Sequence, residues 1–204
     1  MKDRSGPLRL EIAGGIASGK TTLARLLKPI GVVPIHERFR RNPFFEAFYR
    51  DPVGVALEAE ITFLLQHYHD QKNVAKTSKL YCADFSLLLD RAYADVTLSR
   101  SNRRVFEVVR RRVETQLPRR HLTIYLECSP SVLLGRIRRR DRLAERAIGV
   151  QYLSKVDRAL RRVIGSLPRA ERVLRIDSES LDFAHCPAAG LKVRKEVRRA
   201  IQAR

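Results

Sequence analysis

The feature that most constrains this chain is a glycine-rich stretch near its beginning. Residues 14–21 read GGIASGKT and match the pattern G-x-x-x-x-G-K-[ST] at every fixed position. An apolar run, Leu8–Ala13, precedes the stretch, and a helix-forming run, Thr22–Lys28, follows it. A strand, a turn and a helix in this order direct backbone N–H groups and a helix N-terminus at one point, where phosphate binds. The alternative is a glycine-rich turn without a ligand, but the order of the three parts favours the phosphate-binding loop.

The loop also predicts roles for single side chains. In loops of this pattern the lysine, here Lys20, reaches the β- and γ-phosphates, and the next hydroxyl, that of Thr21, contacts Mg²⁺. The glycines allow the backbone to close around the phosphate chain. The residues expected to bind the nucleotide are Gly14, Gly15, Ile16, Ala17, Ser18, Gly19, Lys20, Thr21 and Thr22.

Four further β-type runs follow the loop, and helix-like sequence separates each from the next. The runs are Gly31–His36, Lys79–Asp84, Leu122–Glu127 and Arg172–Asp177. Strands that alternate with helices predict an α/β fold of the P-loop NTPase type, with a five-stranded parallel sheet covered by helices on both faces. Ligands of such sheets bind at the carboxyl ends of the strands. A chain of 204 residues has room for one such domain, which we expect to span residues 1–204.

The charge balance is strongly basic. The chain has 41 lysines and arginines against 22 aspartates and glutamates, a formal net charge of +19. A charge of this size is compatible with a nucleic-acid partner. The arginines gather in Arg100–Arg120 and Arg136–Arg146 without interleaved aromatic platforms, which favours solvated helix faces over a nucleic-acid surface. A substrate rich in phosphate groups also benefits from such a field.

No segment indicates a membrane or an export signal. No apolar run approaches the ~20 residues that a membrane helix needs, and Met1–Pro7 is short and charged. The three cysteines, Cys82, Cys128 and Cys186, are scattered and form no C-x-x-C pair, which argues against a zinc or redox site. We therefore expect a cytoplasmic protein without membrane contact, with reduced cysteines and with Cys82 and Cys128 in the core.

Carboxylates follow two of the expected strands. Glu37 comes after the second run and Asp84 ends the third. Phosphoryl transfer to a hydroxyl needs an acceptor for the proton, so Glu37 is a candidate general base; an exposed loop glutamate is the alternative. Asp84 together with Thr21 has the arrangement that holds Mg²⁺ between β- and γ-phosphates.

A long helix is expected to begin with Pro52 in its first turn and to reach about Gln71. Its apolar stripe consists of Val53, Leu57, Ile61, Leu64 and Tyr68. Glu60 and His67 flank this stripe seven residues apart, so they point the same way, roughly 10 Å from each other. They either line a pocket or reach water. The aromatic side chains of residues 44–49, just before this helix, are expected to be mostly core.

An arginine-rich segment follows the fourth strand. Ser129 and Pro130 open a helix, with Ser129 as its cap. The helix leads into Arg136–Arg146, where six of eleven residues are arginines. This segment is either a solvated helix or a lid whose guanidinium groups neutralise phosphate charge. Its position after the fourth strand of a phosphate-loop pattern favours an arginine-rich lid at about 136–146.

Taken together, these features resemble the deoxynucleoside kinase family, over roughly residues 8–165. The carriers of the resemblance are the phosphate loop, Glu37, Phe48-Tyr49-x-Asp51-Pro52, Asp84-x-Ser86 with Asp90-Arg91, and Arg136-Ile137-x-x-Arg140-x-Arg142-x-x-Glu145. The resemblance implies ATP- and Mg²⁺-dependent phosphorylation of the 5′-hydroxyl of a (deoxy)nucleoside or nucleoside-like small molecule. It also implies a homodimer built on helix packing.

The resemblance further implies roles for site residues. Glu37 would accept the proton of the 5′-hydroxyl, and Tyr49 and Glu145 would contact the 3′-hydroxyl of the sugar. Asp84 would take the magnesium-linked acidic position. Three residues would surround the base, and three lid arginines would bind phosphates, with Lys20 beside them. The base-facing residues are Glu60, His67 and Asp90, and the lid arginines are Arg136, Arg140 and Arg142.

Three residues depart from the family pattern. Glu60 stands where a glutamine is typical, and an ionised carboxylate would only accept hydrogen bonds from the base. His67 stands where an arginine is usual, and a coupled pair between His67 and Glu60 is one expected arrangement. Phe85 replaces the arginine of the acidic-Arg-Ser motif, and losing a contact of that kind can cost ~10²–10³ in rate.

Two alternative functions stay open from the sequence. The first is a nucleoside monophosphate kinase of the thymidylate kinase type, in which Arg38 and Arg91 would hold the acceptor phosphate in the absence of an arginine at Phe85. The second is a catalytically weak protein that binds nucleotides or nucleic acids, which the charge of +19 and Phe85 indicate.

Overall fold

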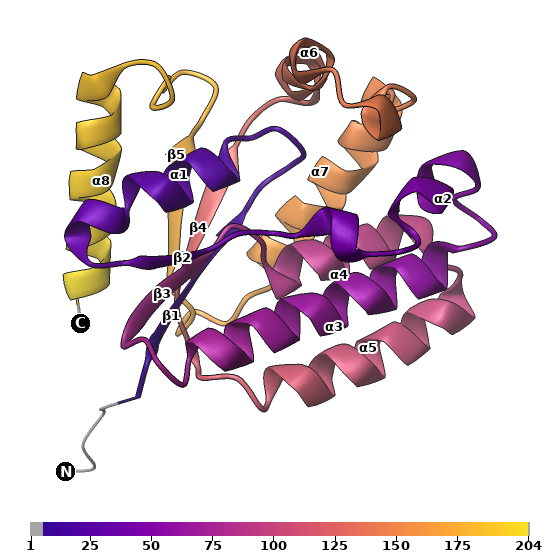
Figure 1. Cartoon of the computed structure of the whole chain (residues 1–204), viewed down its shortest axis with the longest axis horizontal. Helices are drawn as coiled ribbons and strands as arrows, with labels where there is room; N and C mark the ends of the chain where they lie inside the picture. Colours follow the sequence, from indigo (N-terminus) through magenta and orange to yellow (C-terminus); the bar gives the residue numbers. More distant parts are fainter. Residues whose placement is uncertain (1–5, 204) are drawn as a thin grey trace.

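The computed structural model describes residues 6–203, and a five-stranded sheet forms the centre of this part of the chain (Figure 1). All neighbouring strands run parallel, in the order β2-β3-β1-β4-β5. The strands are β1 (Leu8–Ala13), β2 (Val33–Ile35), β3 (Leu80–Ala83), β4 (Arg120–Glu127) and β5 (Val173–Asp177). The predicted α/β fold with five parallel strands is confirmed.

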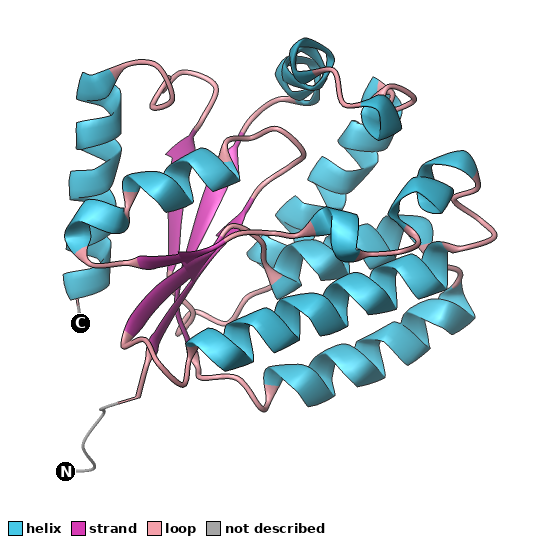
Figure 2. Cartoon of the chain, in the orientation of Figure 1, coloured by secondary structure: helices cyan, strands magenta, loops and turns pink. Residues whose placement is uncertain are grey.

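Helices cover both faces of this sheet (Figures 1 and 2). In Figure 1, α1 and α8 lie on one side, the group of α3, α4, α5 and α7 lies on the other, and α6 lies beyond the carboxyl ends of the strands. The α-helices are α1 (Lys20–Leu26), α2 (Phe45–Arg50), α3 (Ala56–Val74), α4 (Leu87–Thr97), α5 (Arg100–Glu114), α6 (Pro130–Arg140), α7 (Val150–Gly165) and α8 (Pro187–Gln202). Short 3₁₀ helices span Lys28–Ile30, Phe39–Arg41 and Leu143–Glu145.

Side chains alternate between the two faces along the central strand β1. Leu10 and Ile12 are fully buried in one apolar cluster with residues of α1 and α8. Ala13 packs in a second cluster, with residues of α4 and α7. The strand is therefore buried on both faces, and its two charged residues, Arg9 and Glu11, are buried as well.

The glycine-rich loop joins β1 to α1 and makes a tight turn. Gly19 and Ala17 both have a left-handed φ, which is 99° at Gly19 and 64° at Ala17. A Cβ at Gly14 would lie 2.6 Å from Ser18 Oγ and 3.1 Å from the carbonyl oxygen of Leu126, so a larger residue does not fit there. The predicted order of strand, loop and helix is confirmed, with α1 beginning two residues earlier than expected.

Charged residues lie beneath the sheet, on the face toward α3 and α5. Glu11 of β1 is fully buried and lies 3.5 Å from both Arg9 and Arg120. Ser86 Oγ donates to Glu11 at 2.9 Å, and Gln71 Nε2 donates at 3.1 Å. Burial acts to raise the pKa of Glu11, but the two arginines and these two donors lower it below its usual value. A buried carboxylate with this many partners stays ionised.

The long helix begins later than predicted. Residues 52–54 form a turn, in which the Gly54 N–H donates to Asp51 Oδ1 at 3.0 Å, and α3 starts at Ala56. Val53, expected in the apolar stripe, is 92% exposed. An aspartate that accepts a nearby backbone N–H competes with helix formation. The prediction of a start at Pro52 is therefore wrong, and the helix ends at Val74 rather than at Gln71.

Other boundaries and local contacts differ in smaller ways. Ser129 precedes α6 but makes no capping hydrogen bond with its side chain; its N–H donates to Glu179 at 2.8 Å instead. Cys82 and Cys128 are buried free thiols, as expected. Among residues 6–203, no helix combines the length and the apolar character that crossing a bilayer requires. The segment Met1–Pro7, which we do not expect to be an export signal, lies mostly outside the described residues.

Candidate active site

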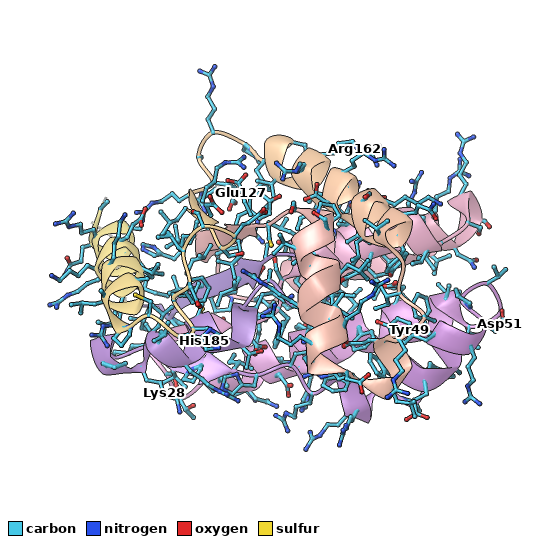
Figure 3. All side chains as sticks on the ribbon, turned by 90° about the horizontal axis from the view of Figure 1, so that it is seen from above. Lys28, Tyr49, Asp51, Glu127, Arg162 and His185 are labelled. Carbon is cyan, nitrogen blue, oxygen red and sulfur yellow. The ribbon has the colours of Figure 1, made fainter. Side chains whose placement is uncertain are left out.

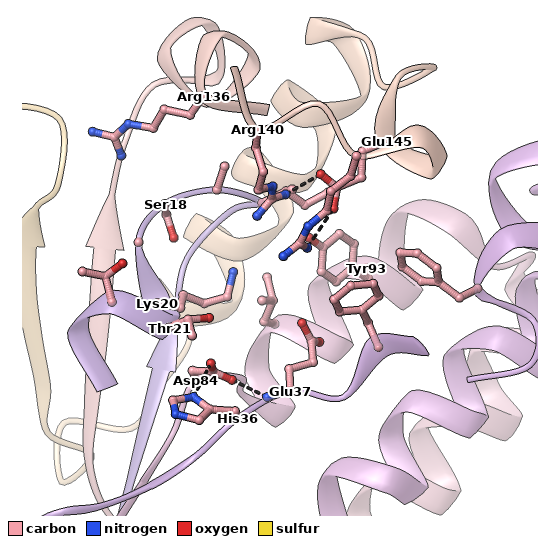
Figure 4. Close-up of a pocket in the computed structure, with 18 of the residues that line it drawn as sticks. Ser18, Lys20, Thr21, His36, Glu37, Asp84, Tyr93, Arg136, Arg140 and Glu145 are labelled. Atoms are coloured by element: carbon pink, nitrogen blue, oxygen red, sulfur yellow. Dashed lines mark hydrogen bonds and ion pairs between the residues drawn. The ribbon is translucent and has the colours of Figure 1, made fainter. Parts of the chain in front are cut away.

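The carboxyl ends of β1, β2, β3 and β4 open onto a cavity of about 820 Å³ (Figure 4). Its size falls in the range of sites for small molecules and cofactors. The phosphate loop, the residues after β2 and β3, the arginine-rich lid and an aromatic group all contribute to its wall. Residues predicted for the site that line it are Ile16, Ala17, Ser18, Gly19, Lys20, Thr21, Thr22, Glu37, Tyr49, Glu60, Asp84, Arg136, Arg140, Arg142 and Glu145.

Lys20 lies at the junction of the loop and α1. Its ammonium group donates to the carbonyl oxygens of Gly14 at 2.9 Å and Gly15 at 3.0 Å. These two glycines do not line the cavity themselves. Their contribution is indirect, because their carbonyl oxygens hold the ammonium group of Lys20. Burial lowers the pKa of Lys20, against the opposing charges of Glu37 and Asp84. When a nucleotide binds, the ammonium group can donate to phosphate oxygens instead of to these backbone carbonyl oxygens.

Asp84 positions the residues after β2. It is 2% exposed; its Oδ1 accepts from the backbone N–H of Glu37 at 2.6 Å, and its Oδ2 lies 3.0 Å from His36 Nδ1. Figure 4 shows these contacts below Lys20 and Thr21. Sequence reasoning missed that Asp84 holds the backbone of Glu37, because the two residues are 47 positions apart.

Glu37 points into the cavity. Its side chain is 36% exposed, and Figure 4 shows it directed toward the same space as Lys20. Partial burial acts to raise the pKa of this carboxyl, but its contact with His67 and the charges of Lys20 and Arg142 outweigh that effect and lower the pKa. Glu37 is therefore ionised at neutral pH and able to accept a proton.

The donor set around Thr21 and Asp84 suits Mg²⁺. A hydroxyl and a carboxylate line the cavity on the same side as the phosphate loop. Within residues 6–203 no group of three or more His, Cys, Asp or Glu side chains could hold a metal ion. Mg²⁺ in phosphoryl-transfer sites typically takes one or two carboxylates and completes its shell with waters and substrate phosphates. The residues present therefore fit a magnesium ion that arrives with a nucleotide.

Two of the three predicted lid arginines converge on one buried carboxylate. Arg140 and Arg142 both pair with Glu145, Arg142 at 3.3 Å, and Glu145 is only 4% exposed. Arg136 instead donates to the carbonyl oxygen of Ser178 at 2.6 Å. Arg139 also lines the cavity, although it was not predicted for the site. Glu145 thus holds two guanidinium groups at the cavity. The phosphates of a bound nucleotide would replace Glu145 as the partner of these groups.

Aromatic side chains form the part of the cavity wall opposite the phosphate loop. The run 44–49, expected to be mostly core, is only half-buried in its aromatic members, and several of them line the cavity. Phe45 packs edge-on against Tyr49 at 5.3 Å. The density of aromatics before the long helix was the available signal; helix α2 turns them toward the cavity. The aromatic lining consists of Phe39, Phe45, Phe48, Tyr49, Phe63, Tyr93 and Tyr152.

Glu60 is a polar group within this aromatic wall. It is 6% exposed, and its Oε1 accepts from Thr97 Oγ1 at 2.9 Å. Burial raises the pKa of Glu60 to about 8, and the charge of Asp90 adds to the effect. The expectation of an ionised carboxylate is therefore wrong at neutral pH. A neutral carboxyl both donates and accepts, as an amide does.

His67 and Asp90 lie behind the wall and not in it. Neither side chain lines the cavity, and both are 4% exposed. His67 Nδ1 lies 2.9 Å from Asp90 Oδ2, and its Nε2 lies 3.3 Å from Glu37 Oε1. The expected pair between His67 and Glu60 is therefore wrong. Helix periodicity places the two on one side of α3, but their partners come from other elements.

The chain is also similar to known proteins. A family model described as deoxynucleoside kinase matches residues 10–202. Deoxyguanosine kinase of Bacillus subtilis (strain 168) is 29% identical over 182 residues, which cover 85% of this chain and 88% of that protein. Deoxyadenosine kinase of Dictyostelium discoideum is 26% identical over 180 residues, 85% of this chain and 74% of that protein.

A solved structure adds support for the fold. The deoxyadenosine kinase from M. mycoides with bound dCTP superposes with a TM-score of 0.80 over 94% of this chain and 100% of that chain. The two sequences are 20% identical in this comparison, so the likeness concerns the fold alone.

Proposed function

The chain belongs to the deoxynucleoside kinase family, and from this premise we propose that it transfers the γ-phosphoryl group of ATP to the 5′-hydroxyl of a purine deoxynucleoside. It is thus a transferase that phosphorylates nucleosides, and the two alternative functions are not favoured. The observation that carries the proposal is the meeting of Lys20, Glu37 and Arg140 around one cavity.

The donor half of the site is the phosphate loop. The backbone of residues 16–22 and the ammonium group of Lys20 are suited to bind the phosphates of ATP. Thr21 and Asp84 would hold Mg²⁺, which neutralises charge on the β- and γ-phosphates when it is bound. Arg140 and Arg142 face the same space and stabilise the charge that the transferred group carries.

The acceptor half begins at Glu37. Its carboxylate orients the 5′-hydroxyl toward the γ-phosphorus and accepts the hydroxyl proton. In the transfer, a bond forms between the 5′-oxygen and the γ-phosphorus while the bond from that phosphorus to the bridging oxygen of ADP breaks. The leaving oxygen takes the electron pair of the broken bond. The backbone N–H of Glu37 donates to Asp84, and this hydrogen bond limits the directions in which the Glu37 carboxylate can point.

The sugar and the base would bind between the lid and the aromatic wall. Tyr49 and Glu145, which line the cavity, would contact the 3′-hydroxyl of the sugar, as the family resemblance implies. The neutral carboxyl of Glu60 offers one donor and one acceptor, which match adjacent groups on the edge of adenine or of guanine. The curated relatives named above are a deoxyguanosine and a deoxyadenosine kinase, which favours purines.

A substrate panel tests this proposal. Deoxyadenosine, deoxyguanosine, deoxycytidine, thymidine, two ribonucleosides, dAMP and dTMP are incubated with ATP and Mg²⁺, and new phosphate esters are separated by chromatography. We expect monophosphates of the purine deoxynucleosides. Turnover of dTMP without turnover of any nucleoside would establish the monophosphate kinase alternative, and turnover of pyrimidines alone would overturn the purine assignment.

The role of Glu37 as the general base is tested by the variant Glu37→Gln. The amide keeps the size of the side chain but cannot accept the proton, so we expect kcat to fall by about 10²–10⁴-fold, with little change in the affinity for ATP. Glu46→Gln, on the exposed side of α2, is the matched control and should keep full activity. Equal activity of Glu37→Gln and the wild type contradicts the role of Glu37.

We also propose that the protein is a homodimer, as the family resemblance implies. Sedimentation of the full chain should give twice the monomer mass of 23.4 kDa, and a monomer contradicts the proposal. The cytoplasmic location stays a prediction from the sequence.

A further inference from the structure

We propose that His67 is a positioning residue, which orients the Glu37 carboxylate and supplies to it the positive charge that the neighbouring Phe85 cannot supply. The inference deepens the proposed function and rests on it. His67 does not line the cavity, so it acts on the reaction through Glu37.

The first observation is a chain of three side chains from three elements. Asp90 comes from α4, His67 from α3 and Glu37 from the segment after β2. The two nitrogens of one imidazole face two carboxylates: Nδ1 lies 2.9 Å from Asp90 Oδ2, and Nε2 lies 3.3 Å from Glu37 Oε1. Only an imidazole that carries protons on both nitrogens can donate in both directions.

The second observation is that the ring has a fixed plane. The imidazole stacks on the ring of Phe85 with the centroids 4.1 Å apart and an interplanar angle of 10°. Phe63 packs on it as well, with the centroids 5.8 Å apart. Phe85 is 1% exposed and His67 is 4% exposed, so neither ring is free to turn. Phe85 thus sets the plane of the imidazole, whereas an arginine at this position would bring its own charge.

The third observation concerns charge. Burial acts to lower the pKa of His67, but the Asp90 carboxylate and then Glu37 outweigh it and raise the pKa to about 10. Glu60 lies two turns away along the same side of α3 and is neutral below a pH of about 8. His67 is therefore a cation at the pH of the reaction, although an unperturbed histidine is mostly neutral there.

The contact between His67 and Glu37 is incomplete in a way that suits catalysis. Nε2 is buried and has no hydrogen-bond partner of good geometry, although Glu37 Oε1 is within ion-pair distance. The Glu37 side chain, 36% exposed, has the freedom to turn and complete this bond. Catalytic hydrogen bonds are often loose without substrate and tighten in the complex. With Oε1 held by His67, Oε2 is left for the 5′-hydroxyl.

The consequence for Glu37 is a defined charge and a defined direction. The His67 cation lies 3.3 Å from Glu37 Oε1, so the carboxylate has a cationic partner on one of its oxygens when the hydroxyl arrives. Positioning of this kind matters here, because the transition state of phosphoryl transfer is loose and leaves most of the work to positioning. His67 thus contributes orientation, and Asp90 keeps the imidazole charged.

The principal experiment compares three variants of the full chain: His67→Gln, His67→Arg and the control His69→Gln. His69 lies two residues further along α3 and is exposed. We expect His67→Gln to lower kcat by about 10²-fold and to change the KM for ATP by less than about threefold. The loss falls on kcat because the carboxylate that receives the proton is no longer held in one direction.

The variants also separate positioning from a merely structural role. His67→Arg keeps a cation between the two carboxylates, so it should restore at least part of kcat, and His69→Gln should match the wild type in every measurement. If His67→Gln loses activity only in proportion to a loss of folded protein, the inference is overturned. Activity of His67→Gln within about twofold of the wild type overturns it as well.

A second measurement does not depend on turnover. Nitrogen NMR of the histidine-labelled wild-type protein reports the protons on each ring. We expect His67 to keep protons on both nitrogens up to about pH 9. A neutral His67 at pH 7.5 overturns the inference. If no nucleoside is phosphorylated but His67 is charged, the failure belongs to the proposed function.

Discussion

At the scale of single residues, the reaction depends on two glutamates that have the same side chain but lie in opposite electrostatic environments. Glu37 has a cation nearby and a lowered pKa. Glu60 is buried beside Asp90, and its pKa is raised to about 8. Burial disfavours the charged form, whereas a neighbouring cation favours it. The two glutamates line one cavity, one ready to accept a proton and the other able to donate a hydrogen bond.

The protonation of Glu60 leads to a prediction about activity. In Glu60→Gln the amide offers one donor and one acceptor, as the neutral carboxyl does, so kcat/KM for the best purine deoxynucleoside should stay within about threefold at pH 7. Above pH 8 the wild type should lose activity as Glu60 ionises, and the variant should not. The measurement is kcat/KM from pH 6 to 9, with exposed Glu58→Gln on the same helix as the control.

The same residue predicts a dependence of stability on pH. The pKa of Glu60 rises from 4.5 to about 8 on folding, so between these values the folded protein holds a proton that the unfolded chain releases. The stability of the wild type relative to Glu60→Gln should be highest below pH 4.5, fall as pH rises, and level off above about pH 8. The total change is up to about 5 kcal/mol. Urea denaturation at a series of pH values measures it; a difference that does not vary with pH contradicts the shift.

At the scale of elements, the turn from β3 to α4 links the catalytic edge to the buried charges beneath the sheet. Asp84 follows the strand, and Ser86 caps the helix by accepting from the Leu88 N–H at 3.1 Å. The same hydroxyl donates to Glu11 at 2.9 Å. One serine therefore begins a helix and also satisfies a buried carboxylate.

This double role predicts the effect of Ser86→Ala. The loss of the cap costs about 1 kcal/mol, and the loss of a donor to a buried charge adds about 1.5–3 kcal/mol. Ser99, which caps α5 at an exposed site by accepting from the Asn102 N–H at 3.2 Å, is the matched control. Ser99→Ala should cost only about 1 kcal/mol. Urea denaturation compares them; equal losses would show that the Glu11 contact contributes nothing.

At the scale of the whole molecule, the parallel sheet brings distant segments to one edge. Lys20, Glu37 and Asp84 follow three strands, and the lid follows a fourth. The net charge of +19 is spread more widely: Figure 3 shows nitrogen-tipped side chains around most of the outline. The field of such a surface attracts anions from solution, whatever their site.

This charge predicts a difference between the two substrates. ATP is a polyanion and the deoxynucleoside is neutral, so added salt should affect them differently. Between about 50 and 500 mM KCl, kcat/KM for MgATP should fall by roughly three- to tenfold, while the KM for the deoxynucleoside changes by less than about twofold. Initial rates with each substrate varied in turn provide the measurement. Equal effects on both substrates would indicate a general loss of activity.

Several features of this protein follow from local sequence alone. The phosphate loop, the five strands and the carboxylates Glu37 and Asp84 at strand ends were predictable, because a motif and its spacing act over a few residues and parallel strands end at one edge. The position of the arginine-rich segment after β4 was predictable as well, and its role as a lid stays a prediction.

Only the tertiary structure decided which groups meet. Periodicity put Glu60 and His67 on one side of a helix, but α4 and the segment after β2 determined that His67 faces Asp90 and Glu37. The aromatic run became a cavity wall and not core, because α2 packs over an open site. The protonation of Glu60 depends on desolvation. Helical periodicity specifies a direction, whereas the neighbours in that direction and the water they exclude belong to the whole fold.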